Sequence, residues 1–362
     1  MVKNNYQVAE RLSLLEFKKS SHFRDLREVD VEYQKLRLEK VILVGVWNRG
    51  LTTKNQAEES LEELSALATT AGASVLGTVL VHRQIPDKKY YIGLGKLQQL
   101  EQLVFEQLAD TVVFDNNLSP SQRTVIENKL QIKVIDRTAL ILDIFALHAK
   151  SKEGKAQVEL AQLQYLLPRL RGWGQSMSRQ AGGQVGSGVS GMGSRGPGET
   201  QLELDRRAIN YRILTLKKHL SKMAKDRLTK RQSRQDKKVL SASIIGYTNS
   251  GKSSLLKVLT GYNPLIQNAL FATVDTVTKK LYQDGEYTYI ISDTVGFISN
   301  LPTGLIESFR ATLEESANSN LLIHLVDASS KLVDKQIGVV NDILSDIRSE
   351  DNIRSYYFAF TI

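Results

Sequence analysis

The octapeptide GYTNSGKS, residues 246–253, has the residue types and spacing of a phosphate-binding loop. It matches GxxxxGK[ST], and it lies between an apolar, strand-like run and a segment with helical spacing, as this motif requires. Glycines let backbone N–H groups surround phosphate oxygens, Lys252 offers a positive charge to the β and γ phosphates, and the Ser253 hydroxyl can ligate Mg2+. The segment therefore predicts a nucleoside triphosphate site with Mg2+.

A second motif, DTVG at residues 293–296, closes a strand-like run farther along the chain. Asp293 is suited to hold Mg2+ through a water molecule, and the Gly296 N–H to sense the γ-phosphate. At this spacing behind a phosphate-binding loop, DxxG is typical of small GTPases rather than of ATPases in general. Phe297 follows where Ras-like proteins have a water-orienting glutamine. We expect either slow intrinsic hydrolysis, with a group supplied by a partner, or a phenyl ring that only packs the switch.

Between the two motifs, LFATVDTVTKK (residues 270–280) contains the expected switch threonine, which completes the metal shell when the γ-phosphate is present. Thr273 is the preferred candidate, and Thr276 and Thr278 are alternatives that spacing alone does not separate. The predicted catalytic residues are Lys252, Thr273 and Gly296, and the predicted metal ligands are Ser253, Thr273 and Asp293. The predicted nucleotide contacts are Gly246, Tyr247, Thr248, Asn249, Ser250, Gly251, Lys252, Ser253, Phe271, Ala272, Thr273, Val274, Asp275, Asp293, Thr294, Val295 and Gly296.

The elements around these motifs predict an α/β protein. Short apolar runs alternate with helical patterns over residues 41–150, which indicates an N-terminal domain with a parallel sheet. The same rhythm resumes in a P-loop domain over 239–362, where Asp284-Gly285 predicts a hairpin and one antiparallel strand. Residues 1–40 are an N-terminal extension. Asp115 and Asp136 end two strands of the first sheet and point weakly to a second ligand crevice.

Residues 151–238 predict a helical hairpin. Its first arm, 155–170, carries apolar Val158, Ala161, Leu163, Tyr165 and Leu166, and its second, 199–232, has Leu202, Ile209, Ile213, Leu216 and Leu220 on one stripe. Between the arms, residues 171–199 contain ten of the 24 glycines, so this tip is either a flexible linker or a binding loop that orders on a partner.

Positive charge is concentrated in the second arm. Residues 205–238 hold thirteen Lys/Arg and three acidic residues, which accounts for the +9 of the whole chain. Such a stripe suggests a polyanionic partner, most simply nucleic acid, or else a solvated helix face. The sequence has no cysteine and no apolar run long enough for a signal peptide or membrane span. We expect a cytoplasmic monomer without disulfides or thiolate-bound zinc.

Several segments in order resemble the HflX family of translation-associated GTPases. They include FDNNLSPSQ (114–122), GSRGPGETQLELDRR (193–207), GYTNSGKSSL, FATVD (271–275) and DTVGFISNLPTGLIESFRATLEE (from Asp293). The resemblance implies an N-terminal α/β domain, a helical hairpin with a glycine-rich loop, and a GTPase domain that hydrolyses GTP with Mg2+. It also implies binding to the large ribosomal subunit, with a role in ribosome splitting, rescue or biogenesis, and makes the glycine-rich loop and basic helix the expected contact with ribosomal RNA. ATP binding by the N-terminal domain is a weaker implication.

The sequence departs from the family pattern at three places. Ser250 stands where the family usually has alanine, and DTVTKK (275–280) replaces a DPTTRR-like run, which leaves Thr273 as the better-supported switch residue. In the family, the strand matching YYFAFTI (356–362) leads into an NKxD loop that recognises guanine. The sequence ends at this strand. We therefore interpret the chain as a C-terminally shortened GTPase with GTP/GDP and Mg2+ as ligands. The alternatives are a non-catalytic ribosome- or RNA-binding remnant and a P-loop ATPase with relaxed base choice.

Overall fold

The structure is a computed structural model that describes residues 40–48, 52–172, 197–236, 238–262, 270–284, 287–302, 304–309, 313, 319–347 and 355–360. The expected N-terminal extension, except Lys40, and most of the glycine-rich tip lie outside the described residues. The chain divides into two compact units, Met1–Leu140 and Ile141–Ile362, which we describe separately.

The first unit is a parallel four-stranded sheet in the order β2-β1-β3-β4. Its strands are β1 (Lys40–Trp47), β2 (Ser74–His82), β3 (Thr111–Phe114) and β4 (Lys133–Asp136), and its helices are α2 (Lys54–Thr70), α3 (Leu94–Gln107) and α4 (Pro120–Leu130). Each helix connects two parallel strands, as crossovers require. The alternation of strands and helices expected for this parallel α/β sheet is confirmed.

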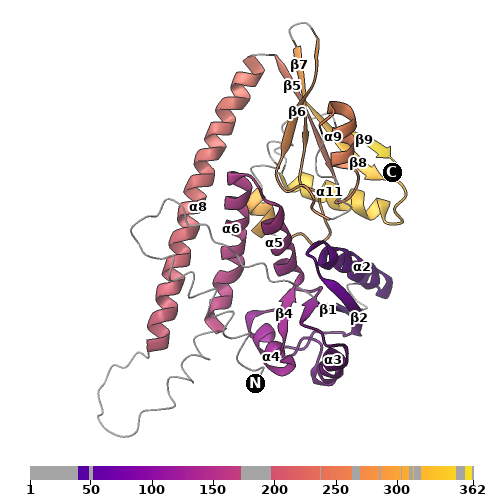
Figure 1. Cartoon of the computed structure of the whole chain (residues 1–362), viewed down its shortest axis with the longest axis vertical. Coiled ribbons are helices and arrows are strands. Elements are labelled where there is room, and N and C mark those ends of the chain that lie inside the picture. Colours follow the sequence, from indigo (N-terminus) through magenta and orange to yellow (C-terminus); the bar gives the residue numbers. More distant parts are fainter. Residues whose placement is uncertain are drawn as a thin grey trace. The chain divides into compact units, whose positions relative to one another are not determined.

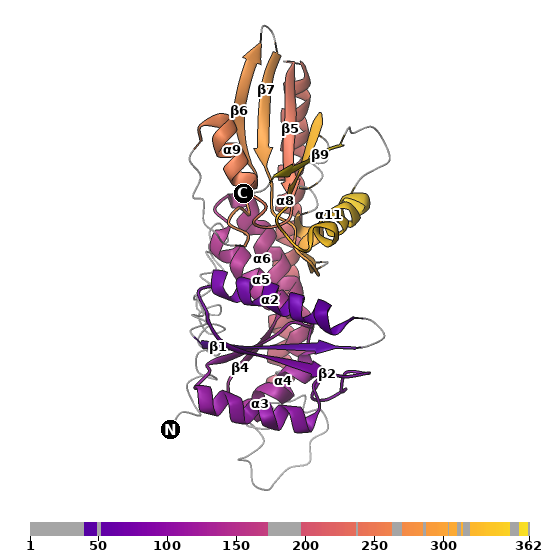
Figure 2. The ribbon, with the colours of Figure 1, turned by 90° about the vertical axis from the view of Figure 1, so that its right-hand side faces the viewer.

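Both faces of this sheet are covered. Figure 2 shows α2 on one face and α3 and α4 on the other. Ile42 and Val44 of β1 pack with Leu100 of α3 and Ile126 of α4 in one core. On the opposite face, Gly45 lies so close to α2 that a Cβ there would be 3.0 Å from Leu61. Double coverage explains why the strands are continuous apolar runs rather than alternating ones.

The acidic residues at the ends of these strands are engaged within the unit. Asp115 accepts a hydrogen bond from the Ser60 hydroxyl at 2.7 Å and forms an ion pair with Arg137 at 2.8 Å. Arg137 also pairs with Glu63, and its side chain is only 2% exposed. Asp136 accepts a hydrogen bond from the Ala139 N–H in the first turn of α5 (Arg137–His148). These contacts give both carboxylates structural roles at the edge where a second ligand crevice was considered.

The second unit begins with the helical hairpin. Helix α6 (Lys152–Leu166) continues as the 3-10 helix η2 (Leu167–Gly172), and α8 (Pro197–Asp236) runs back along it, as Figure 1 shows. Arg212 of α8 donates two hydrogen bonds, of 2.6 and 2.8 Å, to Glu159, and Arg227 pairs with Glu153 one to two turns earlier on α6. The residue numbers of these pairs rise along α8 while they fall along α6. The two helices are therefore antiparallel, as predicted.

The core of the hairpin confirms the stripe expected on α8 and corrects the one expected on α6. Ile209, Ile213, Leu216 and Leu220 all pack toward α6, whereas the side chain of Leu202, the fifth residue of the expected stripe, lies outside those that the structure describes. On α6, however, the residues that meet them are Ala156, Leu160 and Leu163, and of the five named from the sequence only Leu163 belongs to this contact. Val158 and Ala161 are buried elsewhere, at 2% and 3% exposure. Helix α6 is buried on more than one side, so its sequence has no single apolar stripe.

The remaining strands form a five-stranded sheet in the order β6-β7-β5-β8-β9. The strands are β5 (Val239–Gly246), β6 (Val277–Asp284), β7 (Tyr287–Asp293), β8 (Leu321–Asp327) and β9 (Ser355–Phe360), and the helices between them are α9 (Lys252–Thr260) and α11 (Val333–Ile347). Strand β6 pairs with β7 in the antiparallel sense and the other pairs are parallel, which confirms the hairpin predicted from Asp284-Gly285. The carboxyl ends of β5 and β7 therefore lie at one edge, where ligands bind in such sheets.

Candidate nucleotide-binding site

The phosphate-binding loop connects the end of β5 to the start of α9. Asn249 and Gly251 have left-handed backbone conformations, with φ of 59° and 84°, so the chain turns sharply before the helix begins at Lys252. A Cβ at Gly246 would lie 2.2 Å from the backbone oxygen of Leu325 on β8. Glycine is therefore needed at this position for β5 and β8 to pair.

Lys252 is buried at the first position of α9. Its ammonium group donates a hydrogen bond of 2.5 Å to the Tyr247 carbonyl, and the residue is 6% exposed. Burial lowers the pKa of Lys252 to about 8, while the nearby Asp293 charge opposes the shift. A phosphate group next to this ammonium would favour its charged form. The site thus holds a desolvated cation where the motif expects one for the β and γ phosphates.

Ser253, Thr273 and Asp293 converge from three separate segments. The Ser253 hydroxyl donates a hydrogen bond of 2.6 Å to Asp293 Oδ2 and lies 2.9 Å from the Thr273 hydroxyl oxygen. Of the three threonines considered, Thr273 is the one that contacts the loop. Thr278 instead pairs with Ser292 at 2.8 Å, and the Thr276 hydroxyl is buried without a hydrogen-bond partner among the described residues.

This cluster suits a hard divalent cation. Asp293 is 1% exposed, and its Oδ1 is buried without a hydrogen-bond partner in the described part of the chain. Burial raises the pKa of the Asp293 carboxyl, although Lys252 and the Ser253 hydroxyl oppose the shift. An orphaned carboxylate oxygen beside two hydroxyls supplies the oxygen ligands that Mg2+ prefers. The residues present therefore fit a magnesium ion.

The segment after β7 lies directly on the phosphate-binding loop. Phe297 donates a backbone hydrogen bond of 3.1 Å to the Gly246 carbonyl and accepts one of 2.7 Å from the Thr248 N–H. A Cβ at Gly296 would meet Thr248 Cγ2 at 2.8 Å and Lys252 Nζ at 3.1 Å. Only glycine can bring the backbone this close to Lys252. Phe297 itself is 2% exposed, so its ring packs in the core.

The other residues around Thr273 turn away from the loop. Phe271 and Val274 are each 2% exposed and lie in the core, while Ala272 is half-buried. Asp275 accepts hydrogen bonds from the start of α6. In the switch loop (residues 270–276), Thr273 contacts the phosphate-binding loop through Ser253.

Sequence reasoning missed Ser299, which contacts Tyr247 of the phosphate-binding loop. The Ser299 N–H donates a hydrogen bond of 2.7 Å to the Tyr247 phenol oxygen, and the two hydroxyls lie 2.8 Å apart. This contact joins the phosphate-binding loop to the segment after DxxG. A tyrosine and a serine 52 positions apart carry no spacing signal, so only the fold brings them together. Thr294, a predicted nucleotide contact, is buried and donates to the Ile244 carbonyl at 2.8 Å.

His324 lies in the middle of β8, 3% exposed, as expected of a core residue. Burial, aided by the charge of Lys252, lowers its pKa from 6.5 to about 4. The unfolded chain binds this proton more readily, so stability is full above pH 6.5 and is lost as the pH falls toward 4. Between pH 7 and 5 we expect a loss of about 2 kcal/mol from this group.

Urea unfolding followed by far-ultraviolet circular dichroism at both pH values tests this. His324→Leu should lose less stability than the wild type over this interval, by the amount that His324 contributes. His219→Gln, which alters an exposed histidine of α8, should retain the wild-type dependence. Equal pH dependence in all three proteins contradicts the prediction.

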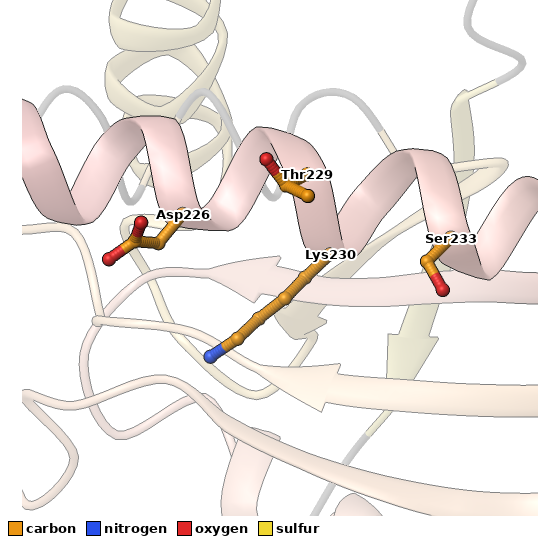
Figure 3. Close-up of a pocket in the computed structure, with 4 residues that line it drawn as sticks. All are labelled: Asp226, Thr229, Lys230 and Ser233. Carbon is orange, nitrogen blue, oxygen red and sulfur yellow. The ribbon is translucent and has the colours of Figure 1, made fainter.

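The outer face of α8 is basic. Its exposed cations are Arg206, Arg207, Lys217, Lys218, Lys222, Lys225 and Lys230. An open hollow of about 670 Å³ is lined by Asp226, Thr229, Lys230 and Ser233, whose side chains project from the helix in Figure 3. One acid, one base and two hydroxyls, all exposed, do not form a phosphate site comparable to that around Lys252. In the described part of the chain, no helix has the length and apolarity to cross a membrane.

Three family models match successive parts of the chain. "GTP-binding GTPase N-terminal" matches residues 58–146, "GTP-binding GTPase Middle Region" matches 148–234, and "50S ribosome-binding GTPase" matches 241–356. Among solved structures, a GTP-binding protein from the archaeon Sulfolobus solfataricus in complex with GDP is 27% identical, covering 86% of this chain and 78% of that one, with a TM-score of 0.45. We draw no structural inference from a TM-score this low.

Sequence relatives cover most of the chain. GTPase HflX of Caldanaerobacter subterraneus is 44% identical over 309 residues, 85% of this chain and 69% of the relative. GTPase HflX of Alkalihalophilus pseudofirmus is 45% identical over 84% of this chain and 68% of the relative. GTPase HflX of Escherichia coli is 40% identical over 86% and 71%. With this identity over more than two thirds of both partners, the chain belongs to the HflX family of ribosome-binding GTPases.

Proposed function

We propose that this chain binds GTP and GDP with Mg2+ at the loop 246–253 and hydrolyses GTP. The observation that carries the proposal is the meeting of three groups from separate segments beside Lys252. The Ser253 hydroxyl oxygen lies 2.6 Å from Asp293 Oδ2 and 2.9 Å from the Thr273 hydroxyl oxygen. Ser253 and Thr273 would ligate the ion directly and Asp293 through water. When bound, Mg2+ neutralises charge on the β and γ phosphates.

The chain's own residues bind and orient the nucleotide. The Lys252 ammonium would exchange its hydrogen bond with the Tyr247 carbonyl for phosphate oxygens. The Gly296 N–H would meet the γ-phosphate, which requires the backbone bridge between Phe297 and the phosphate-binding loop to adjust. The Phe297 ring has no hydrogen-bonding group with which to orient water, and it is buried in the core. We therefore propose slow intrinsic hydrolysis that the ribosome accelerates.

We further propose that the exposed cations of α8, with the glycine-rich segment that precedes it in sequence, contact ribosomal RNA of the large subunit. The support is the basic outer face of α8 described above and the 50S ribosome-binding family match. Binding to RNA phosphates releases counterions and so depends steeply on salt. The protein would act as a monomer in the cytoplasm, where translating ribosomes are found.

Fluorescent GTP, GDP and ATP titrations with and without Mg2+, together with phosphate release with and without purified large subunits, test the nucleotide proposal. Selective guanine binding and subunit-stimulated release support it. Equal affinity for ATP favours an ATPase, and co-sedimentation with large subunits without nucleotide binding favours a non-catalytic ribosome-binding protein.

Neutralising three lysines tests the proposed RNA contact. The triple variant Lys217→Gln, Lys218→Gln, Lys222→Gln should co-sediment more weakly with large subunits and lower the slope of log affinity against log salt by about 2. The matched control, Lys54→Gln, Lys88→Gln, Lys96→Gln, removes the same charge from exposed lysines of the first unit. Equal losses in both proteins would show that the effect depends on net charge and not on the lysines of α8, which contradicts the proposed contact.

A further inference from the structure

The carboxylate of Asp275 is bound to the start of helix α6. Its Oδ2 accepts hydrogen bonds of 2.7 Å from the N–H groups of both Lys150 and Ser151, and its Oδ1 accepts one of 2.5 Å from the Ser151 hydroxyl. Ser151 is the N-cap of α6 and accepts a hydrogen bond of 2.8 Å from the Gly154 N–H. A negative charge is favourable at this end of a helix. The switch loop is therefore tied to the first turn of α6.

A second contact fixes the other side of the switch loop. The Phe271 ring lies 4.6 Å, between centroids, from the ring of Phe145 in α5, which in turn lies 5.3 Å from Phe309. Phe271 has a left-handed backbone, with φ of 59°, and is 2% exposed. A bulky residue keeps such a strained conformation only where its surroundings impose it. The α5–α6 corner thus holds the switch loop two residues before and two residues after Thr273.

The sequence of α6 leaves room for this contact. A Cβ at Gly154 would lie 2.1 Å from Asp275 Oδ1, a distance that real atoms do not tolerate. Glycine is unfavourable within a helix because it gains backbone freedom on unfolding. Its presence in the first turn of α6 agrees with a requirement for the Asp275 carboxylate at that position.

We infer that Asp275 and Phe271 are positioning residues for Thr273, through which the helical hairpin controls magnesium binding at the nucleotide site. The inference rests on the proposed function, since it assigns the regulation of that site. Coupling between sites is reciprocal. The hairpin therefore sets how readily Thr273 meets the ion beside Ser253, and nucleotide with Mg2+ in turn stabilises the first turn of α6.

Magnesium titrations of fluorescent GTP binding test the coupling in the full chain. Asp275→Ala should raise the Mg2+ concentration for half-maximal binding by about 10-fold, the lower end of the effect of losing a group that orients metal ligands. It should leave affinity in EDTA within about twofold of the wild type. Gly154→Ala should shift the Mg2+ requirement in the same direction. Because alanine favours helix over glycine, that variant displaces Asp275 without weakening α6 itself.

The matched control is Ser119→Ala. Ser119 is the N-cap of α4 in the first unit, where its side chain accepts a hydrogen bond of 3.2 Å from the Gln122 N–H. This variant removes a helix cap of the same kind at a place remote in sequence from the switch loop. Its Mg2+ requirement should equal that of the wild type.

Hydrogen exchange supplies a readout that a purely structural cap would not give. In the wild type, GTP with Mg2+ should slow amide exchange in residues 148–156 relative to GTP in EDTA, and this response should vanish in both Asp275→Ala and Gly154→Ala. A wild type that binds no GTP in either condition overturns the proposed function and this inference together. Normal GTP binding with unchanged Mg2+ titrations in both variants, or with no exchange response in the wild type, overturns the inference alone.

Discussion

Lys252→Ala is expected to lower the affinity for GTP and GDP by about 30- to 3,000-fold. Removing one partner of a buried, hydrogen-bonded charge pair costs about 2–5 kcal/mol of binding free energy, and each 1.4 kcal/mol is a factor of ten. Lys252 meets these conditions because it is 6% exposed and its ammonium group donates a hydrogen bond inside the loop, where phosphate oxygens would replace the Tyr247 carbonyl. Fluorescent nucleotide titrations measure the loss directly.

Lys257→Ala is the matched control for this variant. Lys257 belongs to the same helix, α9, but its side chain is exposed, so its removal should change affinity by less than about twofold. Circular dichroism establishes that both variants fold. If Lys252→Ala bound GTP within threefold of the wild type, the phosphates would have to bind elsewhere, and the proposed site would be abandoned.

Asp293→Asn is expected to weaken magnesium binding without lowering the free energy of unfolding at pH 7. Loss of a carboxylate that orients a metal's ligands typically weakens metal binding by about 10- to 100-fold, so the Mg2+ concentration for half-maximal GTP binding should rise by that factor. The fold should not lose stability at pH 7. Burial holds the pKa of Asp293 above its unfolded value, so its ionised form costs free energy in the folded protein, and a neutral asparagine removes that cost.

The comparison variant is Asp327→Asn, at the end of β8, which is separated from β7 by β5 in the same sheet. There the carboxylate accepts hydrogen bonds of 2.9 and 2.6 Å from the Ser329 N–H and hydroxyl, in an exposed turn. Its substitution should leave the Mg2+ requirement unchanged. An Asp293→Asn protein that unfolds more easily than the wild type but keeps its Mg2+ titration would show that the carboxylate is structural.

Much of the site was predictable because its signals are local. The loop 246–253 is one turn between a strand and a helix, and Asp293 and Gly296 lie three residues apart at the end of β7, so motif spacing alone indicates their chemistry. The strands were equally readable, since they are short runs of β-branched and aromatic residues with a hairpin signal at Asp284. The segments that resemble HflX proteins likewise indicate the family from sequence alone.

The contacts that organise the site were not predictable in this way. Asp275 and Ser151 are 124 positions apart. Neither residue type indicates that the switch-loop carboxylate binds the N-terminus of α6. Likewise, the packing face of α6 is hidden because the helix buries polar residues such as Gln157, 2% exposed, along with apolar ones. Periodicity identifies a buried face only where another face is left to solvent.

Helix α8 has a mechanical consequence that follows from its length. Its 40 residues span about 60 Å at 1.5 Å per residue. One end of α8 leads into the GTPase sheet, since two residues separate it from the start of β5. Its other end continues in sequence into the glycine-rich segment. A tilt of about 5° at the β5 end would move the far end by about 5 Å, close to one helical turn. A small rearrangement near the nucleotide site would thus displace the far end of α8 by a distance comparable to the size of a nucleotide base.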